Sequence, residues 1–373
     1  MTTTVLGARR LNRILLERQL LTRRHALSAE DAIAHLVGMQ AQAPHPPYTG
    51  LWTRLVDFDP EELSTLLTDR SVVRLSLMRG TVHLVTAADA LTLRPVVQRL
   101  YDAAMYNHHE YGAGARDVGL DPDELVVEAG ELLEKEAMTA KALGLALAAR
   151  RPDVAPGVLA HVVRTRLALI QAPPRALWRR SGQTVYRTAE HWLGRPLATV
   201  SAPDAMLLRY LAAFGPASVA DMQAWSGLNR LREVVDRLRP ELVVYRDDTG
   251  RELFDLPDAP RPEEDGPAPV RFVPEFDNLL LAHARRERII SDEDRRRTFT
   301  INGIIRATFL VDGFVAGMWR IVDAKASGRP GPASTLDIEP FRPLADADRE
   351  ALVVEGERLA AFRGLDAGRV RFV

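Results

Sequence analysis

The chain of 373 residues contains no cysteine, which excludes disulfide bonds, a thiolate nucleophile and cysteine-ligated metal sites. No apolar run is long enough to cross a bilayer, and the first residues lack the charged and apolar regions of a signal peptide. There is no Walker loop, dinucleotide fingerprint or Cys/His zinc spacing. These absences predict a soluble, cytoplasmic protein that uses no metal and no organic cofactor.

Lysine is also scarce. It occurs only at positions 135, 141 and 325, so nearly all of the positive charge is arginine. The net charge is only -1, but residues 9–24 carry six arginines against Glu17 alone, residues 121–136 are acidic, and residues 161–195 carry seven arginines. A GC-rich genome explains arginine in place of lysine but not the clustering. Clustered arginine suits phosphate contacts, so the pattern indicates a polyanionic partner.

The length allows two to four domains, and one pattern of three helices followed by a β-hairpin recurs along the chain. It is clearest after residue 200, where apolar spacing and capping residues predict three helices and two strands. These elements are Asp204–Phe214, Val219–Ser226, Arg230–Leu238, Leu242–Tyr245 and Glu252–Leu256. Such a unit is a winged helix, whose third helix enters a DNA groove. Arg230 and Arg232 on that helix are candidate DNA contacts.

A second copy of the pattern lies upstream, with a basic hairpin. Its predicted elements are helices Pro122–Glu136, Thr139–Arg150 and Pro156–Val163, then strands Leu167–Gln171 and Ala176–Tyr186. The second strand carries Trp178, Arg179 and Arg180, and aromatics interleaved with arginines suit base stacking and phosphate contact. The alternative is a wing whose aromatic residues only pack onto the domain.

The N-terminal segment fits the pattern less cleanly. Helices are expected at Leu11–Leu21, Ala29–Met39 and Glu61–Thr68, strands at Val72–Met78 and Thr81–Thr86, and bridging helices at Ala88–Tyr111. The hairpin turns at Arg79 and Gly80. His83 lies in its second strand and is a candidate to face a cleft.

After a proline-rich linker at Pro257–Pro269, the chain predicts a small β-rich domain. Strands are expected at Val270–Val273, Ile304–Val311, Phe314–Val322 and Arg369–Val373, a helix at Asp346–Arg363, and an exposed basic loop around residues 285–297 that includes Arg285 and Arg286. The predicted fold class is α+β. The predicted domains are winged helices at 1–111 (with bridging helices), 112–199 and 200–258, and the β-rich domain at 259–373.

The stretch from Gly38 to Pro47 contains two glutamines before a proline cluster. In a continuous helix Gln40 and Gln42 would face opposite ways, but Pro44 disfavours helical backbone at Ala43. Where the helix ends, the two neutral carboxamides can converge on one cleft. The alternative is that both are solvated or helix-capping residues. Glu275 and Asp277 are the best carboxylates for a conventional acid–base mechanism, with structural hydrogen bonding as their alternative role.

Four motifs together resemble the AlkZ-type DNA glycosylases over essentially the whole chain. They are Leu36–Pro44, Met78–Val85, Phe272–Leu280 and Val311–Trp319. The resemblance implies three tandem winged helices and a C-terminal β-domain arranged as a C around DNA. It also implies excision of N7-alkylated purines and, as in some members, unhooking of interstrand crosslinks. The Gln-Φ-Gln signature of the family falls on Gln40 and Gln42, with glutamine at the second position as in the branch that confers self-resistance to an alkylating antibiotic such as azinomycin.

The chemistry agrees with this resemblance. Alkylation at N7 makes the purine cationic, so it leaves readily, and two carboxamides can orient a water at C1′ through their carbonyl oxygens. The sequence thus predicts a monofunctional, monomeric DNA glycosylase acting on double-stranded DNA without a cofactor; the alternative is a non-enzymatic winged-helix transcription regulator. The expected DNA contacts are Arg79, His83, Trp178, Arg179, Arg180, Arg230, Arg232, Arg285 and Arg286.

Overall fold

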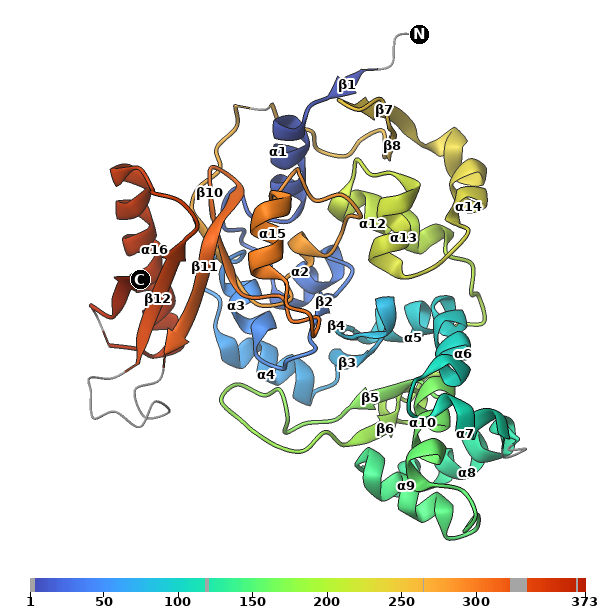
Figure 1. Cartoon of the computed structure of the whole chain (residues 1–373). Coiled ribbons are helices and arrows are strands. Elements are labelled where there is room, and N and C mark those ends of the chain that lie inside the picture. Colours follow the sequence, from blue (N-terminus) through green and yellow to red (C-terminus); the bar gives the residue numbers. More distant parts are fainter. Residues whose placement is uncertain (1–3, 118–120, 264, 323–333, 367) are drawn as a thin grey trace.

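The computed structural model describes residues 4–117, 121–263, 265–322, 334–366 and 368–373, and it is a mixed α+β fold (Figure 1). Within these ranges the strands form three sheets. Helices α12 (Asp204–Phe214), α13 (Val219–Ser226) and α16 (Asp346–Arg363) have the bounds predicted from the sequence. A capping box between Ser218 and Asp221 begins α13, which explains why its start could be predicted.

The other predicted helices are present with small shifts at their ends. They are α1 (Ala8–Arg18), α4 (Pro60–Thr68), α5 (Ala87–Val96), α6 (Gln98–Asn107), α8 (Pro122–Lys135), α9 (Ala140–Ala148), α10 (Pro156–Arg166) and α14 (Leu231–Leu238). The short helices α7 (Gly112–Asp117) and α11 (Ala189–Leu193) were not predicted as separate elements.

The hairpins of the first two predicted domains join in one five-stranded sheet of order β2-β4-β3-β5-β6. Its strands are β2 (Met39–Gln40), β3 (Val72–Ser76), β4 (Val82–Thr86), β5 (Leu169–Gln171) and β6 (Tyr186–Thr188). The contact between the two hairpins is the pairing of Leu75 with Ile170. The predicted boundary near residue 112 is therefore crossed by a continuous sheet.

The N-terminal residues pack against the third predicted domain, and the end of α1 also contacts the first, where the Arg18 carbonyl lies 2.7 Å from Nε2 of His35. Strand β1 (Val5–Leu6) runs parallel to β7 (Val243–Asp247), which pairs with β8 (Glu252–Asp255), and the three lie together near the N-terminus (Figure 1). A buried ion pair from Arg18 to Asp255, at 2.7 and 2.8 Å, joins α1 to β8. The first twenty residues thus complete the unit built from α12, α13 and α14.

The C-terminal sheet has the order β13-β12-β11-β10-β9 and lies with α16 at one side of the molecule (Figure 1). Its strands are β9 (Arg271–Val273), β10 (Thr308–Val311), β11 (Phe314–Val322), β12 (Thr335–Pro340) and β13 (Val370–Phe372). Strand β12 was not predicted, and it occupies the position between β11 and β13. The prediction of a β-rich domain with one long helix otherwise agrees with this arrangement.

The helix predicted before the glutamines ends earlier than expected. The helix expected to reach Met39 is α2 (Ala29–His35), because Val37 and Gly38 have left-handed backbones and the chain turns into β2. After Gln42 the proline cluster begins a further helix that was not predicted, α3 (Pro46–Trp52), with Pro46 and Pro47 in its first turn, where proline is favoured.

Of the predicted strand Ala176–Tyr186, only Tyr186 belongs to a strand, β6, and the rest is a long loop that passes beneath α4 in the view of Figure 1. Positive φ angles at Ala176 and Arg179 are incompatible with a regular strand there. The Trp178 amide donates to the Ser64 hydroxyl at 3.0 Å, which fixes this loop on α4. The expected basic loop around residues 285–297 contains the helix α15 (Asp292–Thr298), capped by Ser291.

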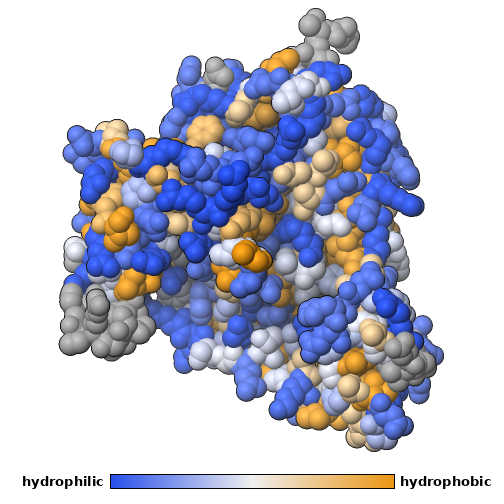
Figure 2. Space-filling model, viewed as in Figure 1, coloured by the Kyte–Doolittle hydropathy of each residue, from blue (hydrophilic) through white to orange (hydrophobic). Residues whose placement is uncertain are grey.

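The surface over α15 is hydrophilic, and a small apolar spot lies just below it (Figure 2). The loop after α15 exposes Ile301 fully and Ile304 by 47%. In the part of the chain that the structure describes, no helix is long and apolar enough to cross a membrane.

Candidate active site

The turn after α2 places Gln40 at the edge of the five-stranded sheet. Gly38 has a φ of 87°, and a Cβ there would lie 2.5 Å from a methyl group of Val85, so glycine is required. The Gln40 backbone then pairs with His83 of β4, and its amide donates to the Asn278 side-chain oxygen at 3.2 Å. The Gln40 side chain is only 7% exposed.

The carboxamide of Gln40 has a fixed orientation. Its Oε1 accepts from Nη2 of Arg79 at 2.8 Å, and the Thr81 hydroxyl lies 3.3 Å from the same oxygen. A guanidinium can only donate, so the oxygen of the amide must face it. The Nε2 group of Gln40 has no hydrogen-bond partner among the described residues. Gln40 therefore presents an N–H donor.

Arg79 and His83 form the support behind Gln40. Nη1 of Arg79 donates to the carbonyl of Trp225, and Nη2 also lies 3.3 Å from Nε2 of His83, whose Nδ1 is 2.9 Å from the Thr81 carbonyl. Because that carbonyl can only accept, Nδ1 carries the proton and Nε2 accepts from Arg79. Both residues were predicted to contact DNA, yet His83 is 1% exposed and has no surface open to a phosphate.

The charges of this pair follow from burial. Desolvation, with a smaller contribution from the charge of Arg286, lowers the pKa of Arg79 to about 10. Desolvation and the charge of Arg79 lower the pKa of His83 to about 3. At neutral pH the support is therefore a cationic Arg79 and a neutral His83. No carboxylate in the described part of the chain forms a salt bridge with Arg79.

Gln42 lies on the same edge of β4 but is exposed. Its Oε1 accepts from the Val82 amide at 3.1 Å, and the intervening Ala41 amide donates to the Val82 carbonyl at 2.8 Å. The two glutamines thus lie along one edge of β4, and their convergence on one cleft stays a prediction. The expectation that both carbonyl oxygens are free to hold a water needs correction, since each already accepts a hydrogen bond from β4 or its turn.

The segment from Pro274 to Asn278 covers Gln40 from the side of the C-terminal sheet. Asp277 is 5% exposed and binds Arg54 through both oxygens at 2.8 and 2.9 Å, so its role is structural. Glu275 has no hydrogen bond and no salt bridge within the described residues. Burial raises the pKa of Glu275, and the charge of Arg363 opposes that shift.

Three cavities meet at Glu275. A crevice of about 10 Å³ is lined by Gln40, Pro46, Pro274, Glu275 and Asn278 among others. A second cavity, of about 220 Å³, is bounded by His45, Thr49, Trp319 and Arg363, and a third, of about 310 Å³, by Arg306, Met318 and Glu339. The crevice has room for about one water, and the larger cavities open toward the C-terminal sheet. No cluster of three metal-ligating side chains occurs among the described residues.

The basic residues predicted on the second hairpin lie on the loop between β5 and β6. Arg179 and Arg180 are exposed, as a phosphate contact requires. Trp178 packs against Tyr48 and Phe362, with ring centroids 4.9 and 5.4 Å apart, which matches the alternative of packing onto the protein.

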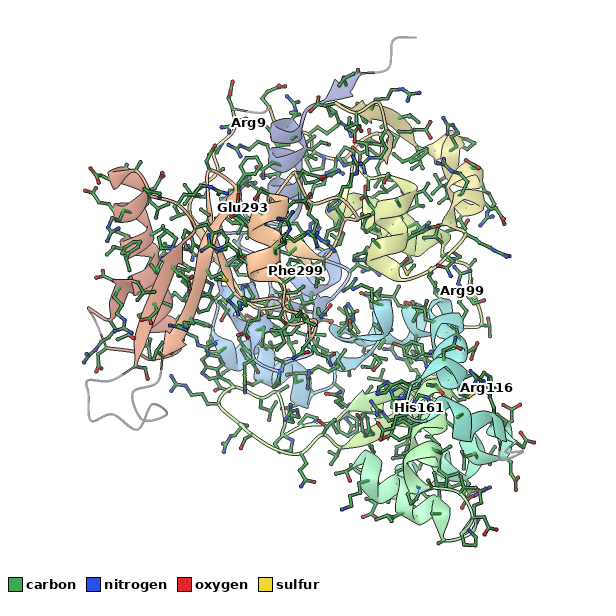
Figure 3. All side chains as sticks on the ribbon, in the orientation of Figure 1. Arg9, Arg99, Arg116, His161, Glu293 and Phe299 are labelled. Carbon is green, nitrogen blue, oxygen red and sulfur yellow. The ribbon has the colours of Figure 1, made fainter. Side chains whose placement is uncertain are left out.

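The remaining predicted DNA contacts lie in two regions, at the start of α14 and in the segment before α15. Arg230, which precedes α14, and Arg285 are exposed, whereas Arg232 forms salt bridges with acids at 3.4 and 3.9 Å. Arg286 donates to the Leu280 carbonyl at 2.7 Å and lies 5.2 Å from the ring of Phe299, which Figure 3 labels near the foot of α15.

Arg99, also labelled in Figure 3, was not predicted and has a connecting role. Its Nη2 donates to the carbonyl of Asn229 at 3.3 Å, so α6 is tied to the turn before α14. Thr81 and Asn278, which both contact Gln40, were missed as site residues. Thr81 lies in the motif Met78–Val85 and Asn278 in the motif Phe272–Leu280, so their positions in the motifs could have identified both as site residues.

Comparisons with known proteins concern the chain as a whole. A sequence model of the family described as DNA glycosylase AlkZ-like matches residues 33–362. The chain is similar to the Interstrand DNA cross-link repair glycosylase of Streptomyces sahachiroi, with 27% identity over 380 residues, covering 96% of this chain and 97% of the relative. It is also similar to the solved structure of Streptomyces sahachiroi DNA glycosylase AlkZ, with a TM-score of 0.82 and 23% identity over 99% of this chain and 100% of that chain.

Proposed function

Because the chain belongs to the DNA glycosylase AlkZ-like family, we propose that it hydrolyses the N-glycosidic bond of N7-alkylated purines in double-stranded DNA and unhooks interstrand crosslinks. The observation that carries the proposal is the pair of neutral glutamines, Gln40 and Gln42, on one edge of β4, with Gln40 lining the crevice beside Glu275. The relative from Streptomyces sahachiroi, named for cross-link repair, supports the crosslink as substrate.

For the architecture, we propose three tandem winged helices and the β-rich domain arranged as a C around the duplex. The order of α12, α13, α14 and the β7–β8 hairpin supports the third of them, and α8, α9, α10 with β5 and β6 support the second. The exposed arginines Arg179, Arg180, Arg230 and Arg285 are the proposed phosphate contacts.

The site supports a hydrolytic step without covalent catalysis. A lyase needs an amine that forms an imine with the sugar. Of the three lysines, Lys135 and Lys141 lie on α8 and α9, which are away from β2 in Figure 1, and Lys325 lies outside the described residues. This supports a monofunctional glycosylase. The alkylated purine is already a cation, so departure needs positioning of the water rather than strong protonation of the base.

The two glutamines divide this positioning between them. Gln42 keeps one lone pair on Oε1 after accepting from Val82, and a water can donate to it. Gln40 offers its Nε2 hydrogens, because its oxygen is held by Arg79. Fixed dipoles of this kind contribute several kcal/mol to a hydrolytic transition state.

The proposal is tested by incubating the protein with a duplex that contains one N7-methylguanine, followed by alkaline cleavage at any abasic site. We expect strand breaks only after alkali, and none with the Gln40→Ala, Gln42→Ala double variant. Breaks without alkali would indicate a lyase. A duplex that is bound specifically but never cut would favour a winged-helix regulator.

The same assay on a crosslinked duplex tests unhooking, since release of one strand changes its mobility under denaturing conditions. For the physiological role, we propose self-resistance to an alkylating antibiotic such as azinomycin. Expression of the gene in a sensitive host is expected to raise survival after exposure to the drug.

A further inference from the structure

Two carboxylates lie in the segment that closes the crevice beside Gln40, and only one of them is engaged. The carboxylate of Asp277 accepts two hydrogen bonds from Arg54 and a third, at 3.0 Å, from the Leu279 amide. Glu275 has no such partner among the described residues, although it lies only two positions away. Glu275 is exposed at the mouth of the crevice that it lines, and a carboxylate there that stabilises nothing around it is a candidate for chemistry.

The backbone holds Glu275 in place beside the glutamine. Phe276 has a φ of 60°, which is rare for a bulky residue, and its amide donates to the Ile305 carbonyl at 3.3 Å. On the other side, the side-chain oxygen of Asn278 accepts a hydrogen bond from the Gln40 amide, and its Nδ2 donates to the Gly38 carbonyl at 2.6 Å. These contacts fix the segment on the strand that carries Gln40, so the position of Glu275 is set by the fold.

Gln40 and Glu275 have complementary hydrogen-bonding groups. Both line the crevice of about 10 Å³, which has room for about one water. Gln40 presents Nε2, because Arg79 occupies its oxygen. A water between them accepts from Gln40, donates to Glu275, and keeps one lone pair for the sugar.

We propose that Glu275 is a catalytic residue, the carboxylate that takes the proton of the attacking water; this inference rests on the glycosylase function proposed above. The water oxygen forms a bond to C1′ as the bond from C1′ to N9 breaks. The electron pair of that bond passes into the purine ring and neutralises the charge of the alkylated base. The proton goes to Glu275, which leaves a neutral alkylpurine, an abasic sugar and a carboxylic acid that later releases its proton to solvent.

The surroundings of Glu275 suit this role. Burial raises its pKa, and the charge of Arg363 limits the rise. A carboxylate of raised pKa is a better proton acceptor than one with the ordinary pKa of glutamate. The other titratable or charged groups that line the cavities meeting at Glu275 are His45, Arg54, Asp277, Arg306, Arg320, Asp337, Glu339 and Arg363.

The test is the single-turnover release of 7-methylguanine from a duplex by the Glu275→Gln variant. We expect release to slow by roughly a hundredfold, the usual effect of a lost general base, while affinity for the lesion duplex stays near that of the wild type. The wild-type rate is expected to fall as the pH drops through the pKa of Glu275, and the variant is expected to lack this dependence.

Glu339→Gln is the matched control. It removes the same charge from a cavity that Glu275 also lines, without touching the crevice beside Gln40. We expect this variant to release base at nearly the wild-type rate, because only Glu275 is placed to receive the proton. An equal loss in both variants would assign the effect to the overall charge and overturn the role of Glu275.

The remaining outcomes separate this inference from the function on which it rests. If the wild-type protein releases 7-methylguanine and Glu275→Gln releases it equally fast, the role of Glu275 is refuted and the glycosylase function stands. A slow variant that keeps the wild-type pH profile also refutes it, since another group such as His45 then titrates. A wild-type protein that releases no base refutes both proposals.

Discussion

Substitution of Gln40 by glutamate distinguishes a donor from an acceptor at this position. Glutamate has nearly the same shape, but it replaces the Nε2 donor with an oxygen. In the wild type the Gln40 oxygen lies 2.8 Å from Nη2 of Arg79, a partly buried cation without a carboxylate partner among the described residues. The new carboxylate can therefore form an ion pair with Arg79, so we expect the variant to fold and its thermal stability to be preserved or increased.

The activity of Gln40→Glu is expected to fall in spite of that stability. Loss of one preorganised donor in an active site typically costs roughly a hundred- to a thousandfold in rate, or about 3–4 kcal/mol. The assay is single-turnover release of 7-methylguanine, with a parallel melting curve and Gln40→Ala as the reference for a simple deletion. Release by Gln40→Glu as fast as by the wild type would show that Gln40 acts as an acceptor and would refute the orientation derived from Arg79.

Three further predictions concern the second glutamine, the basic loop and acid stability. Gln42→Ala is expected to slow base release by roughly tens to hundreds-fold with lesion affinity intact, while Gln42→Asp keeps measurable activity; equal rates for wild type and Gln42→Ala would make this residue structural. Alanine at Arg179 and Arg180 is expected to reduce the slope of log affinity against log salt by roughly one per lost phosphate contact, and an unchanged slope would remove the loop from the interface. Burial lowers the pKa of His83 and of His283 to about 3, so the unfolded chain takes up protons below pH 6.5 that the folded protein does not. Stability is thus expected to be full above that pH and to fall by up to about 1.4 kcal/mol per pH unit for each histidine as the pH decreases toward 3; a melting temperature equal at pH 7.5 and 5.5 would contradict this.

The local elements of the fold could be predicted because their signals are local. Helix α12 ends at a Gly-Pro pair, α13 has its own capping box, and Asp312 with Gly313 marks the turn between β10 and β11. The strand β12 had no such signal. The pairing of β1 with β7 could not be predicted from the sequence either, because parallel contacts between residues 241 positions apart leave no periodicity in a single sequence.

The glutamines could be predicted as a motif, but their hydrogen bonds could not. The orientation of Gln40 depends on Arg79 and Asn278, which reach it from a turn and from a segment far along the chain. Arg79 looked like a phosphate contact because arginine at a hairpin turn is usually exposed. Here the left-handed backbone of Arg79 directs the guanidinium inward, and a sequence pattern does not report that direction.

The long-range contacts of Gln40 have a consequence for synthesis of the protein on the ribosome. The glutamine needs the Trp225 carbonyl to hold Arg79 and the Asn278 side chain to hold its own backbone, so its surroundings are complete only after residue 278 has been made. Contacts of such sequence separation form slowly. An incomplete chain that already exposes basic surface can meet DNA but has no assembled site, and a base-excising activity is thereby withheld until the molecule is nearly finished.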